Sequence, residues 1–533
     1  MDATRTESAP AAAKKFAALQ WTSRDYGYPL GLALITVVAA LLRFHALGDR
    51  GLWFDEVMSV RISRHDLSHL FQTLRAREIN MALYYVLLHF WLKMGSSEAF
   101  LRSMSVVSSV ATIPFTFAIG SRLFGRTVGL IAAWFLAVNA FHVRYAQEAR
   151  AYALFALLAT ISTYLLVRNI QEPQAGSWAC YGALLALTVY AHLLGVLIIL
   201  AHCAAIACLP PRQIPWKNLA RSGIWLAGMI LPLAVIVPMI HADPLDWLPK
   251  LDAALVHDFL VLIAGNRGIL LFVLEAIGIA LFLLFTVRAF LRGGRSKENW
   301  GSLLVLFWLF VPIVLALTIS AFRPFFVPRF LLPCLPAFLL AASAGLTKIR
   351  PRSVAWTLGG AISILCLAGI VPCYHLGGVL DDWRTISSHV LGEALPEDRI
   401  SFYPEYASAA FEYYRARKTP VPEWPATMAR HPGPAKDSSA PVAKSRDEPK
   451  PTTRLWVIFY SPAGLTPEAR TNLTANLNSW QSKGWPLREP WEFADVAVLL
   501  FVASSPDAVA ASELPAFTFP AAESPDSAGT AAH

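Results

Sequence analysis

The sequence predicts an α-helical polytopic membrane protein with about eleven transmembrane helices and a small soluble α/β domain in its C-terminal part. Hydrophobic residues make up 56% of the 533 residues, charged residues make up 15%, and the mean hydropathy is +0.48. An average soluble domain is about 45–50% apolar and about 25% charged. A further observation is that the composition becomes polar after Pro372. These features exclude a single soluble globular protein and a disordered chain.

Apolar runs that approach the length of a membrane span recur along the first two thirds of the chain. A span needs about 20 mostly apolar residues. The expected spans are residues 28–47, 99–121, 127–142, 150–167, 177–191, 193–209, 222–240, 268–290, 301–320, 330–347 and 353–372. A shorter apolar run, residues 82–94, is better explained by a helix that lies at the membrane interface.

Basic residues in alternate loops give the expected orientation. The net charge is +9, and Lys and Arg gather before the first span and in every second loop. Because cytoplasmic loops carry an excess of Lys and Arg, residues 1–27 are expected in the cytoplasm. An odd number of spans then places the C-terminal domain on the outer side, which is the periplasm for a bacterial inner (plasma) membrane. The basic residues form no continuous stripe, so membrane lipids are expected as partners and nucleic acid is not.

The expected domain organisation has three parts after the cytoplasmic N-terminal segment. Residues 28–372 form the transmembrane module, whose first outer loop is residues 48–98. Residues 373–502 form the extracytoplasmic α/β domain, and residues 503–533, rich in Ala, Ser, Pro and Glu, form a disordered tail.

Within the soluble domain, hydrophobic periodicity predicts one helix and three strands. The helix is WRTISSHVLGEAL, and the strands are residues 399–403, 455–460 and 496–502. Residues 419–453 are rich in Pro, Ala, Lys and Asp and are expected to be a linker or disordered insertion.

Two adjacent carboxylates, Asp55 and Glu56, follow Trp53 and Phe54 just after the first expected span. Burial against aromatic rings raises the pKa of a carboxyl group toward the range of a general base. If the segment is helical, the two side chains point about 100° apart. One would then contact the substrate while the other holds a metal ion or a nearby arginine. The alternative is that both acids simply begin a helix, where they favour its dipole.

The second outer loop reads HVRYAQEAR and contains Arg144, Glu148 and Arg150. Arg144 and Glu148 are four residues apart, so they are able to pair on one helix face. The functional alternative is that one or both arginines bind a phosphate, because a guanidinium donates two parallel hydrogen bonds to it. Arg329 begins a late span on the same side. It either reaches lipid headgroups or binds a lipid-linked phosphate.

Three further polar residues lie on the outer side. His192 sits at the turn between two expected spans and is more typical of a helix end than of a catalytic base. Glu78 and Asn80 precede the interfacial helix. Their oxygens suit a hard divalent cation, together with Asp55 or Glu56.

The order of several motifs resembles a known family. These motifs are RFHALGDRGLWFDE, an LYY helix, SRLFGR, YAQEARAYAL, VYAHLLG, RFLLPCLPAFLLAA and DDWRTISSHV. The chain resembles, from about residue 30 to about residue 415, the GT-C superfamily of polyprenyl-phosphate-dependent glycosyltransferases. Within it, the resemblance is to protein O-mannosyltransferases and lipid A aminoarabinose transferases. One difference is that both prolines that many relatives have before LYY are absent here.

The resemblance implies a function and site roles. Such enzymes transfer a sugar from a polyprenyl-phosphate donor to a lipid, glycan or protein acceptor at the outer membrane face. The family's general base corresponds to Asp55, with Glu56 beside it. Its donor-phosphate arginines correspond to Arg150 and Arg329, with Arg144 as a further candidate. Glu78, Asn80, Glu148 and His192 remain possible substrate or metal ligands, and the metal, a divalent cation if any, is unknown.

Two other functions are compatible with a polytopic membrane protein. A transporter or flippase of lipid-linked glycans needs charged residues along the middle of several spans, often with helix breaks. In this sequence the charges gather at the outer ends of the spans. A membrane scaffold would leave the acidic and aromatic first loop unexplained.

Overall fold

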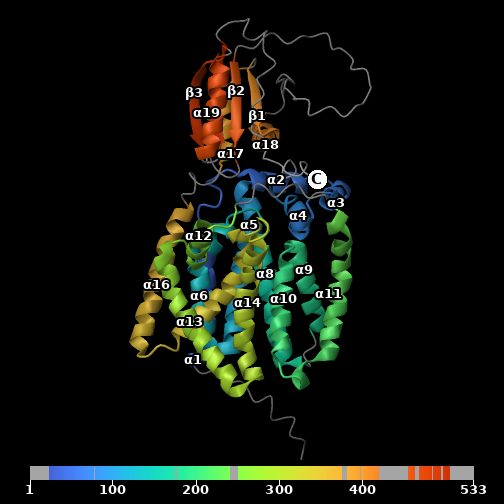
Figure 1. Cartoon of the computed structure of the whole chain (residues 1–533), viewed down its shortest axis with the longest axis vertical. Helices are drawn as coiled ribbons and strands as arrows, with labels where there is room; N and C mark the ends of the chain where they lie inside the picture. The colour runs from blue at the N-terminus through green and yellow to red at the C-terminus, as the bar shows by residue number, and fades with distance from the viewer. Residues whose placement is uncertain are drawn as a thin grey trace, which may run out of the picture.

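The computed structural model shows a helical bundle that carries a small sheet domain at one end (Figure 1). The structure describes residues 23–76, 78–173, 177–239, 250–374, 381–395, 398–418, 454–461, 467–482, 484–493 and 496–503. Most of the expected N-terminal segment, nearly all of the tail and the whole 419–453 insertion lie outside these residues.

Each of the eleven apolar runs forms a helix. The bundle consists of α1 (Ser23–Phe44), α5 (Glu98–Phe124), α6 (Arg126–Val138), α7 (Ala140–Ala146), α8 (Tyr152–Gln171), α9 (Trp178–Ala191), α10 (Gly195–Ala207), α11 (Trp216–Ile236), α12 (Ala253–Ala264), α13 (Gly268–Gly293), α14 (Lys297–Ser320), η7 (Pro328–Cys334), α15 (Leu335–Leu346) and α16 (Arg352–Tyr374). Short 3-10 turns, η4 (Pro211–Gln213) and η5 (Val237–Met239), flank α11. Helix α12 was not predicted.

The expected number of spans is higher than helix length supports. Within the described residues, eight helices are long and apolar enough to cross a membrane, and nine if the bent pair α6 and α7 counts as one span. The difference is α9 and α10, which have 14 and 13 residues. At 1.5 Å per residue such helices are about 20 Å long, shorter than the roughly 30 Å hydrocarbon core. Both nevertheless pack in the bundle, α9 against α8 and α10 against α14.

A break between α6 and α7 turns the chain by 58° and sets the direction of the second outer loop. Asn139 ends α6 and caps α7 by accepting a hydrogen bond from the His142 amide. Arg43, which is fully buried, donates to the carbonyl oxygens of Leu136 and Ala137 beside the break. These carbonyls lack helical partners, and an unpaired carbonyl in the membrane interior costs several kcal/mol. Arg43 therefore stabilises the broken helix.

The first outer loop folds into short elements between the bundle and the sheet domain (Figure 1). They are α2 (Phe54–Ser63), α3 (Leu67–Ala76), η2 (Ile79–Met81) and α4 (Ala82–Trp91). Helix α4 corresponds to the expected interfacial helix. Helices α2 and α3 were not predicted individually.

The C-terminal domain is a four-stranded sheet with helices. Its elements are α17 (Trp383–Glu393), β1 (Arg399–Tyr403), η9 (Glu405–Ala407), α18 (Ser408–Lys418), β2 (Arg454–Tyr460), α19 (Pro467–Ser482), β3 (Leu487–Phe493) and β4 (Val496–Val502). The strand order is β1-β2-β4-β3, in which β1 and β2 are parallel and the other neighbours are antiparallel. The three predicted strands and the predicted helix are confirmed. The edge strand β3 was missed.

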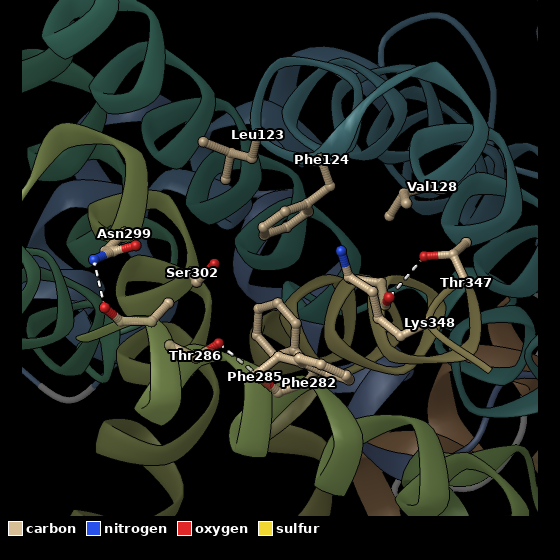
Figure 2. A pocket seen from close by; sticks show the side chains of 12 residues that line it. Leu123, Phe124, Val128, Phe282, Phe285, Thr286, Asn299, Ser302, Thr347 and Lys348 are labelled. Carbon is tan, nitrogen blue, oxygen red and sulfur yellow. Dashed lines mark hydrogen bonds between the residues drawn. The ribbon is translucent and has the colours of Figure 1, made fainter. Parts of the chain in front are cut away.

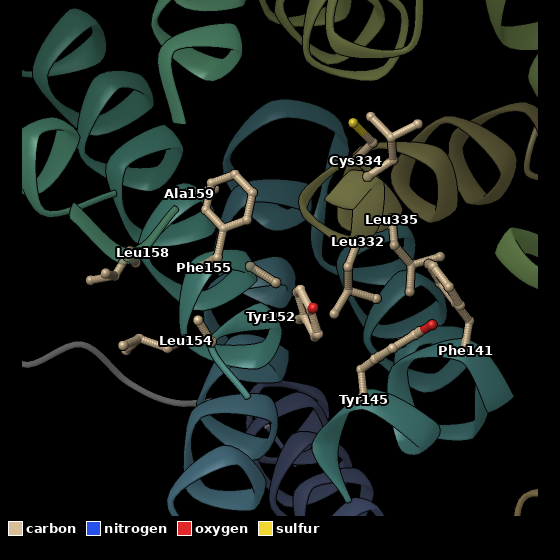
Figure 3. Packing of buried hydrophobic residues seen from close by; sticks show 14 of the residues in the cluster. Phe141, Tyr145, Tyr152, Leu154, Phe155, Leu158, Ala159, Leu332, Cys334 and Leu335 are labelled. Carbon is tan, nitrogen blue, oxygen red and sulfur yellow. The ribbon is translucent and has the colours of Figure 1, made fainter. Parts of the chain in front are cut away.

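The largest apolar core joins the two parts of the molecule. One continuous cluster of buried residues extends from Ile35 in α1 to Leu500 in β4. It includes Tyr145 and Tyr152, which pack with Phe141 and Leu332 (Figure 3). The sheet domain is therefore packed on the bundle end that carries the first two outer loops.

Candidate functional site

Helix α2 begins at the acidic pair and separates its two side chains. Glu56 is the third helical residue, and it accepts a hydrogen bond from the backbone amide of the N-cap residue Trp53 at 3.2 Å. As the helical spacing predicts, the neighbours face different surroundings: the side chain of Glu56 is fully buried, whereas that of Asp55 is 29% exposed. Asp55 is therefore the more accessible carboxylate.

Glu56 is held by Arg102 of α5. The Arg102 guanidinium donates to both carboxylate oxygens, at 2.8 and 2.7 Å, and its other N–H groups reach the carbonyl oxygens of Leu47, Arg50 and Gly51. The Ala149 amide also donates to Glu56, at 2.7 Å. Burial disfavours the charged form of Glu56, but Arg102 and the Ala149 amide hold its pKa below its usual value. This carboxylate thus links the first outer loop, α5 and the second outer loop.

Asp55 faces Arg150. Its Oδ2 atom lies 3.5 Å from Nη2 of Arg150, and its backbone oxygen accepts from Nη1 at 3.3 Å. Ser59, one turn further along α2, accepts from the same Nη1 atom at 3.0 Å. The predicted base and the predicted phosphate ligand are therefore in contact, although they are 95 residues apart in the chain.

Arg150 and Arg329 gather around Tyr152. The guanidinium carbon of each lies 5.8 Å from the centre of the Tyr152 ring. The Nε atom of each is buried without a hydrogen-bond partner. Among the described residues, Arg329 forms no ion pair, unlike Arg102, Arg144 and Arg150. Arg329 is thus an arginine of the site that pairs directly with no carboxylate among the described residues.

Arg144 and Glu148 form an ion pair, with Nε and Oε1 3.7 Å apart, but Glu148 lies beyond the end of α7, so the two residues do not share a helix face as expected. Glu148 is buried, and its other oxygen has no hydrogen-bond partner. Burial raises the pKa of Glu148, although Arg144 acts in the opposite direction. The pair borders the cluster of Arg150, Arg329 and Tyr152, because the charge of Arg329 acts on both Arg144 and Glu148.

His192, Asn80 and Glu78 lie beside this cluster. The His192 ring stacks on Phe155 and approaches Phe330, with ring centres 5.2 and 4.8 Å apart. Burial, together with the charges of Arg150 and Arg329, lowers the pKa of His192 to about 3, so the ring is neutral.

Nδ1 of His192 accepts from the Leu194 amide, so Nε2 carries the proton, and this atom is buried without a hydrogen-bond partner. Asn80 accepts from the Leu193 amide and so fixes the same turn. Glu78 lies near Tyr85, whose pKa is raised by burial and further by the charges of Glu78 and Asp55. In the part of the chain that the structure describes, no three His, Cys, Asp or Glu side chains are grouped to hold a metal ion.

The C-terminal domain holds the acidic loop in place. The Tyr414 hydroxyl accepts from the Leu52 amide at 2.6 Å, and Asp381 accepts from the Phe54 amide at 3.1 Å. The Phe54 ring packs between Tyr406 and Tyr460. Sequence reasoning missed these contacts and the role of Arg102. An arginine inside an otherwise apolar run was the available signal for the latter.

Comparisons with known proteins agree with this architecture. Residues 81–241 match the model of the dolichyl-phosphate-mannose-protein mannosyltransferase family. No curated protein sequence matches the chain significantly.

Solved structures show the similarity of the fold. The crystal structure of ArnT from Cupriavidus metallidurans in the apo state is 13% identical, and the match covers 90% of this chain and 98% of ArnT with a TM-score of 0.55. ArnT bound to undecaprenyl phosphate matches at 13% identity and a TM-score of 0.50, over 89% of this chain and 98% of ArnT. The resemblance predicted from the order of the motifs is therefore confirmed, and the chain has the fold of the GT-C membrane glycosyltransferases.

Proposed function

We propose that the chain is an integral-membrane glycosyltransferase that moves a sugar from a polyprenyl-phosphate donor to an acceptor hydroxyl. The observation that carries this proposal is the half-buried guanidinium of Arg329, which lies beside Arg150 and pairs directly with no carboxylate among the described residues. A partly desolvated cation without a direct partner favours an anion. Two guanidinium groups around one aromatic ring suit a phosphate, which accepts their parallel hydrogen bonds.

The donor is expected to bind with its phosphate against Arg329 and Arg150 and its lipid tail between the helices. Undecaprenyl phosphate occupies the structurally similar ArnT, which supports a polyprenyl phosphate as the donor lipid. The buried Nε2–H group of His192 and the Tyr152 hydroxyl are two further polar atoms without partners in the cluster. We assign them to donor positioning.

The transfer step balances without a cofactor. The acceptor oxygen attacks the anomeric carbon, and Asp55 takes the proton from that oxygen as the new bond forms. The bond between the anomeric carbon and the phosphate oxygen breaks, and the polyprenyl phosphate leaves with the electron pair. Arg150 and Arg329 stabilise the charge that grows on the leaving phosphate. Arg150 also orients Asp55, which it contacts at 3.5 Å.

Other predicted residues act indirectly in this proposal. Glu56, enclosed by Arg102, Trp53 and Ala149, positions Asp55. Arg144 and Glu148 border the phosphate site as a pair, and Asn80 holds the turn of His192. Glu78 and a divalent cation remain predictions from the sequence.

Arg329→Gln is expected to weaken donor binding. Loss of a charge-assisted hydrogen bond costs about 1.5–3 kcal/mol, which corresponds to a roughly 10- to 150-fold higher Kd. Titration of the purified protein with polyprenyl phosphate measures this change. Arg323→Gln is the matched control, because Arg323 is an exposed arginine in the same loop, outside the cluster. Equal affinity of the wild type and Arg329→Gln would remove the phosphate role.

Tyr406 is proposed to contact the acceptor. Its ring packs on Phe54 at 5.4 Å, it is 51% exposed, and partial burial together with the charge of Asp55 raises its pKa. Tyr406 therefore presents an exposed ring close to Asp55, the proposed general base.

Tyr406→Ala is expected to raise the KM for the acceptor and leave donor affinity unchanged, and Tyr406→Phe is expected to retain the stacking surface. Initial-rate kinetics with varied acceptor measures this difference. If Tyr406→Ala changes the donor Kd instead, the ring belongs to the donor side.

The proposed location is a bacterial inner membrane with the sheet domain in the periplasm. The length of α5 supports this orientation, because Arg102 in the site lies near its N-terminus and Arg122, which is expected in a cytoplasmic loop, lies in its last turn.

One observation favours the alternative of a flippase for lipid-linked glycans. Glu275 in α13 is fully buried, and neither carboxylate oxygen has a hydrogen-bond partner. Glu275 is therefore an exception to the gathering of charges at the outer ends of the spans. A buried carboxylate within a span is a feature of transport pathways. Movement of a fluorescent polyprenyl-phosphate sugar across vesicles that contain the protein distinguishes the two functions.

A further inference from the structure

A cavity lies far from the proposed catalytic site. Its volume is about 470 Å³, within the range of small-molecule sites. It is lined by Leu123 and Phe124 at the C-terminal end of α5, whereas Arg102 at the other end of α5 belongs to the Glu56 cluster. A separation of about 20 helical residues corresponds to about 30 Å. The cavity is therefore independent of the sugar-transfer site.

The walls of this cavity are mostly apolar. Side chains from α5, α6 and α13 form them, among them Phe124, Val128, Phe282 and Phe285 (Figure 2). Such a surface inside a membrane bundle is complementary to a hydrocarbon chain and disfavours a water-soluble metabolite.

One end of the cavity is polar and positively charged. The Lys348 side chain extends into it toward Phe124 (Figure 2), and Lys348 forms no ion pair among the described residues. The hydroxyl groups of Thr286 and Thr347 donate to backbone carbonyls, and the Asn299 amide group donates to Ala289 and Gly294. The Lys348 ammonium is thus the main free donor for a ligand.

The surrounding turns increase the positive charge. Residues 286–302 contain four basic residues and one acid, Glu298, and residues 341–374 contain Lys348, Arg350 and Arg352 with no acid. Near a membrane surface each Lys or Arg adds attraction for anionic lipid. The charge is therefore complementary to a lipid phosphate.

We propose that this cavity binds one anionic glycerophospholipid, with its phosphate on Lys348 and an acyl chain against Phe124, Phe282 and Phe285. The bound lipid would contact helices α5, α6, α13, α14 and α15 at once, and so stabilise their packing. This site is separate from the donor site, so the proposal does not depend on sugar transfer.

The test uses the full-length protein in a neutral detergent after removal of bound lipid. Phosphatidylglycerol is expected to give a one-to-one adduct by native mass spectrometry and to raise Tm, whereas phosphatidylcholine and inorganic phosphate are not. Lys348→Gln is expected to weaken phosphatidylglycerol binding about fivefold. Arg212→Gln is the matched control, because this exposed arginine in η4 neither lines the cavity nor belongs to the two basic segments beside it.

A second variant tests the apolar part of the site. Ala289→Phe places a ring in the cavity from an exposed position, so folding is expected to be retained while the adduct is lost. Equal adducts with phosphatidylglycerol and phosphatidylcholine would overturn the proposal. So would an adduct unchanged by both Lys348→Gln and Ala289→Phe, since the lipid would then bind elsewhere.

Discussion

Asp55→Asn is expected to abolish sugar transfer while the protein folds and binds donor. The amide keeps the shape of the carboxylate but does not accept the acceptor's proton. Loss of a general base reduces the rate by about 10²–10⁴-fold. Asp55 makes no buried ion pair that the fold needs, because its carboxylate is 29% exposed and lies 3.5 Å from Arg150. Single-turnover transfer from a saturating donor measures this rate.

The control for Asp55→Asn is Asp49→Asn. Asp49 is an exposed carboxylate six residues earlier in the same loop, and its side chain makes none of the contacts described for the cluster. It is expected to transfer sugar at the wild-type rate. A transfer rate of Asp55→Asn within about tenfold of the wild type would assign the proton transfer to another group.

Arg102→Met is expected to cause the largest loss of stability among single substitutions in the cluster. It leaves Glu56 buried and charged without its partner, and breaking a buried pair in this way costs about 3–5 kcal/mol. The Leu47, Arg50 and Gly51 carbonyl groups lose their donor as well. The Tm in detergent measures the effect, with Arg122→Met as the control, because the Arg122–Glu172 pair is exposed.

The stability that Glu56 contributes also depends on pH in a defined direction. Its pKa is held below the usual value of 4.5 in the folded protein. The contribution is therefore complete above about pH 4.5 and is lost as the pH falls through the folded-state pKa. Glu56→Gln is expected to lower Tm at neutral pH and to reduce the loss of Tm on acidification. An unchanged Tm in Arg102→Met and Glu56→Gln would show that the pair does not hold the loop.

The elements with a continuous apolar signal could be predicted from the sequence. Strand β4 was placed correctly because all of its residues are apolar, and β2 was placed within one residue. Strand β3, LREPWEF, was missed because it is an exposed edge strand with charges and a proline. The α6–α7 break was missed because Arg43, which stabilises it, lies 93 residues from the Leu136 carbonyl that it binds.

The residues of the candidate site could be predicted from motifs. The contacts that hold those residues in place could not. Asp55, Arg150 and Arg329 were identified by a resemblance that assigns roles to single positions. Their mutual arrangement depends on contacts distant in sequence, such as Arg102 with Glu56, Asp381 with Phe54 and Tyr414 with Leu52. No local pattern encodes such pairs. The helical spacing of Asp55 and Glu56 did predict that they face different surroundings.

The most direct test of the account measures donor binding and sugar transfer in the same set of proteins. Wild type, Asp55→Asn, Arg329→Gln and Arg323→Gln are incubated with a panel of radiolabelled polyprenyl-phosphate sugars and a membrane extract as acceptor. The account predicts that wild type and Arg323→Gln transfer one of the sugars. It predicts that Asp55→Asn binds this donor without transfer and that Arg329→Gln binds it weakly. Transfer by Asp55→Asn at the wild-type rate, or binding without transfer by the wild type for every donor, would contradict it.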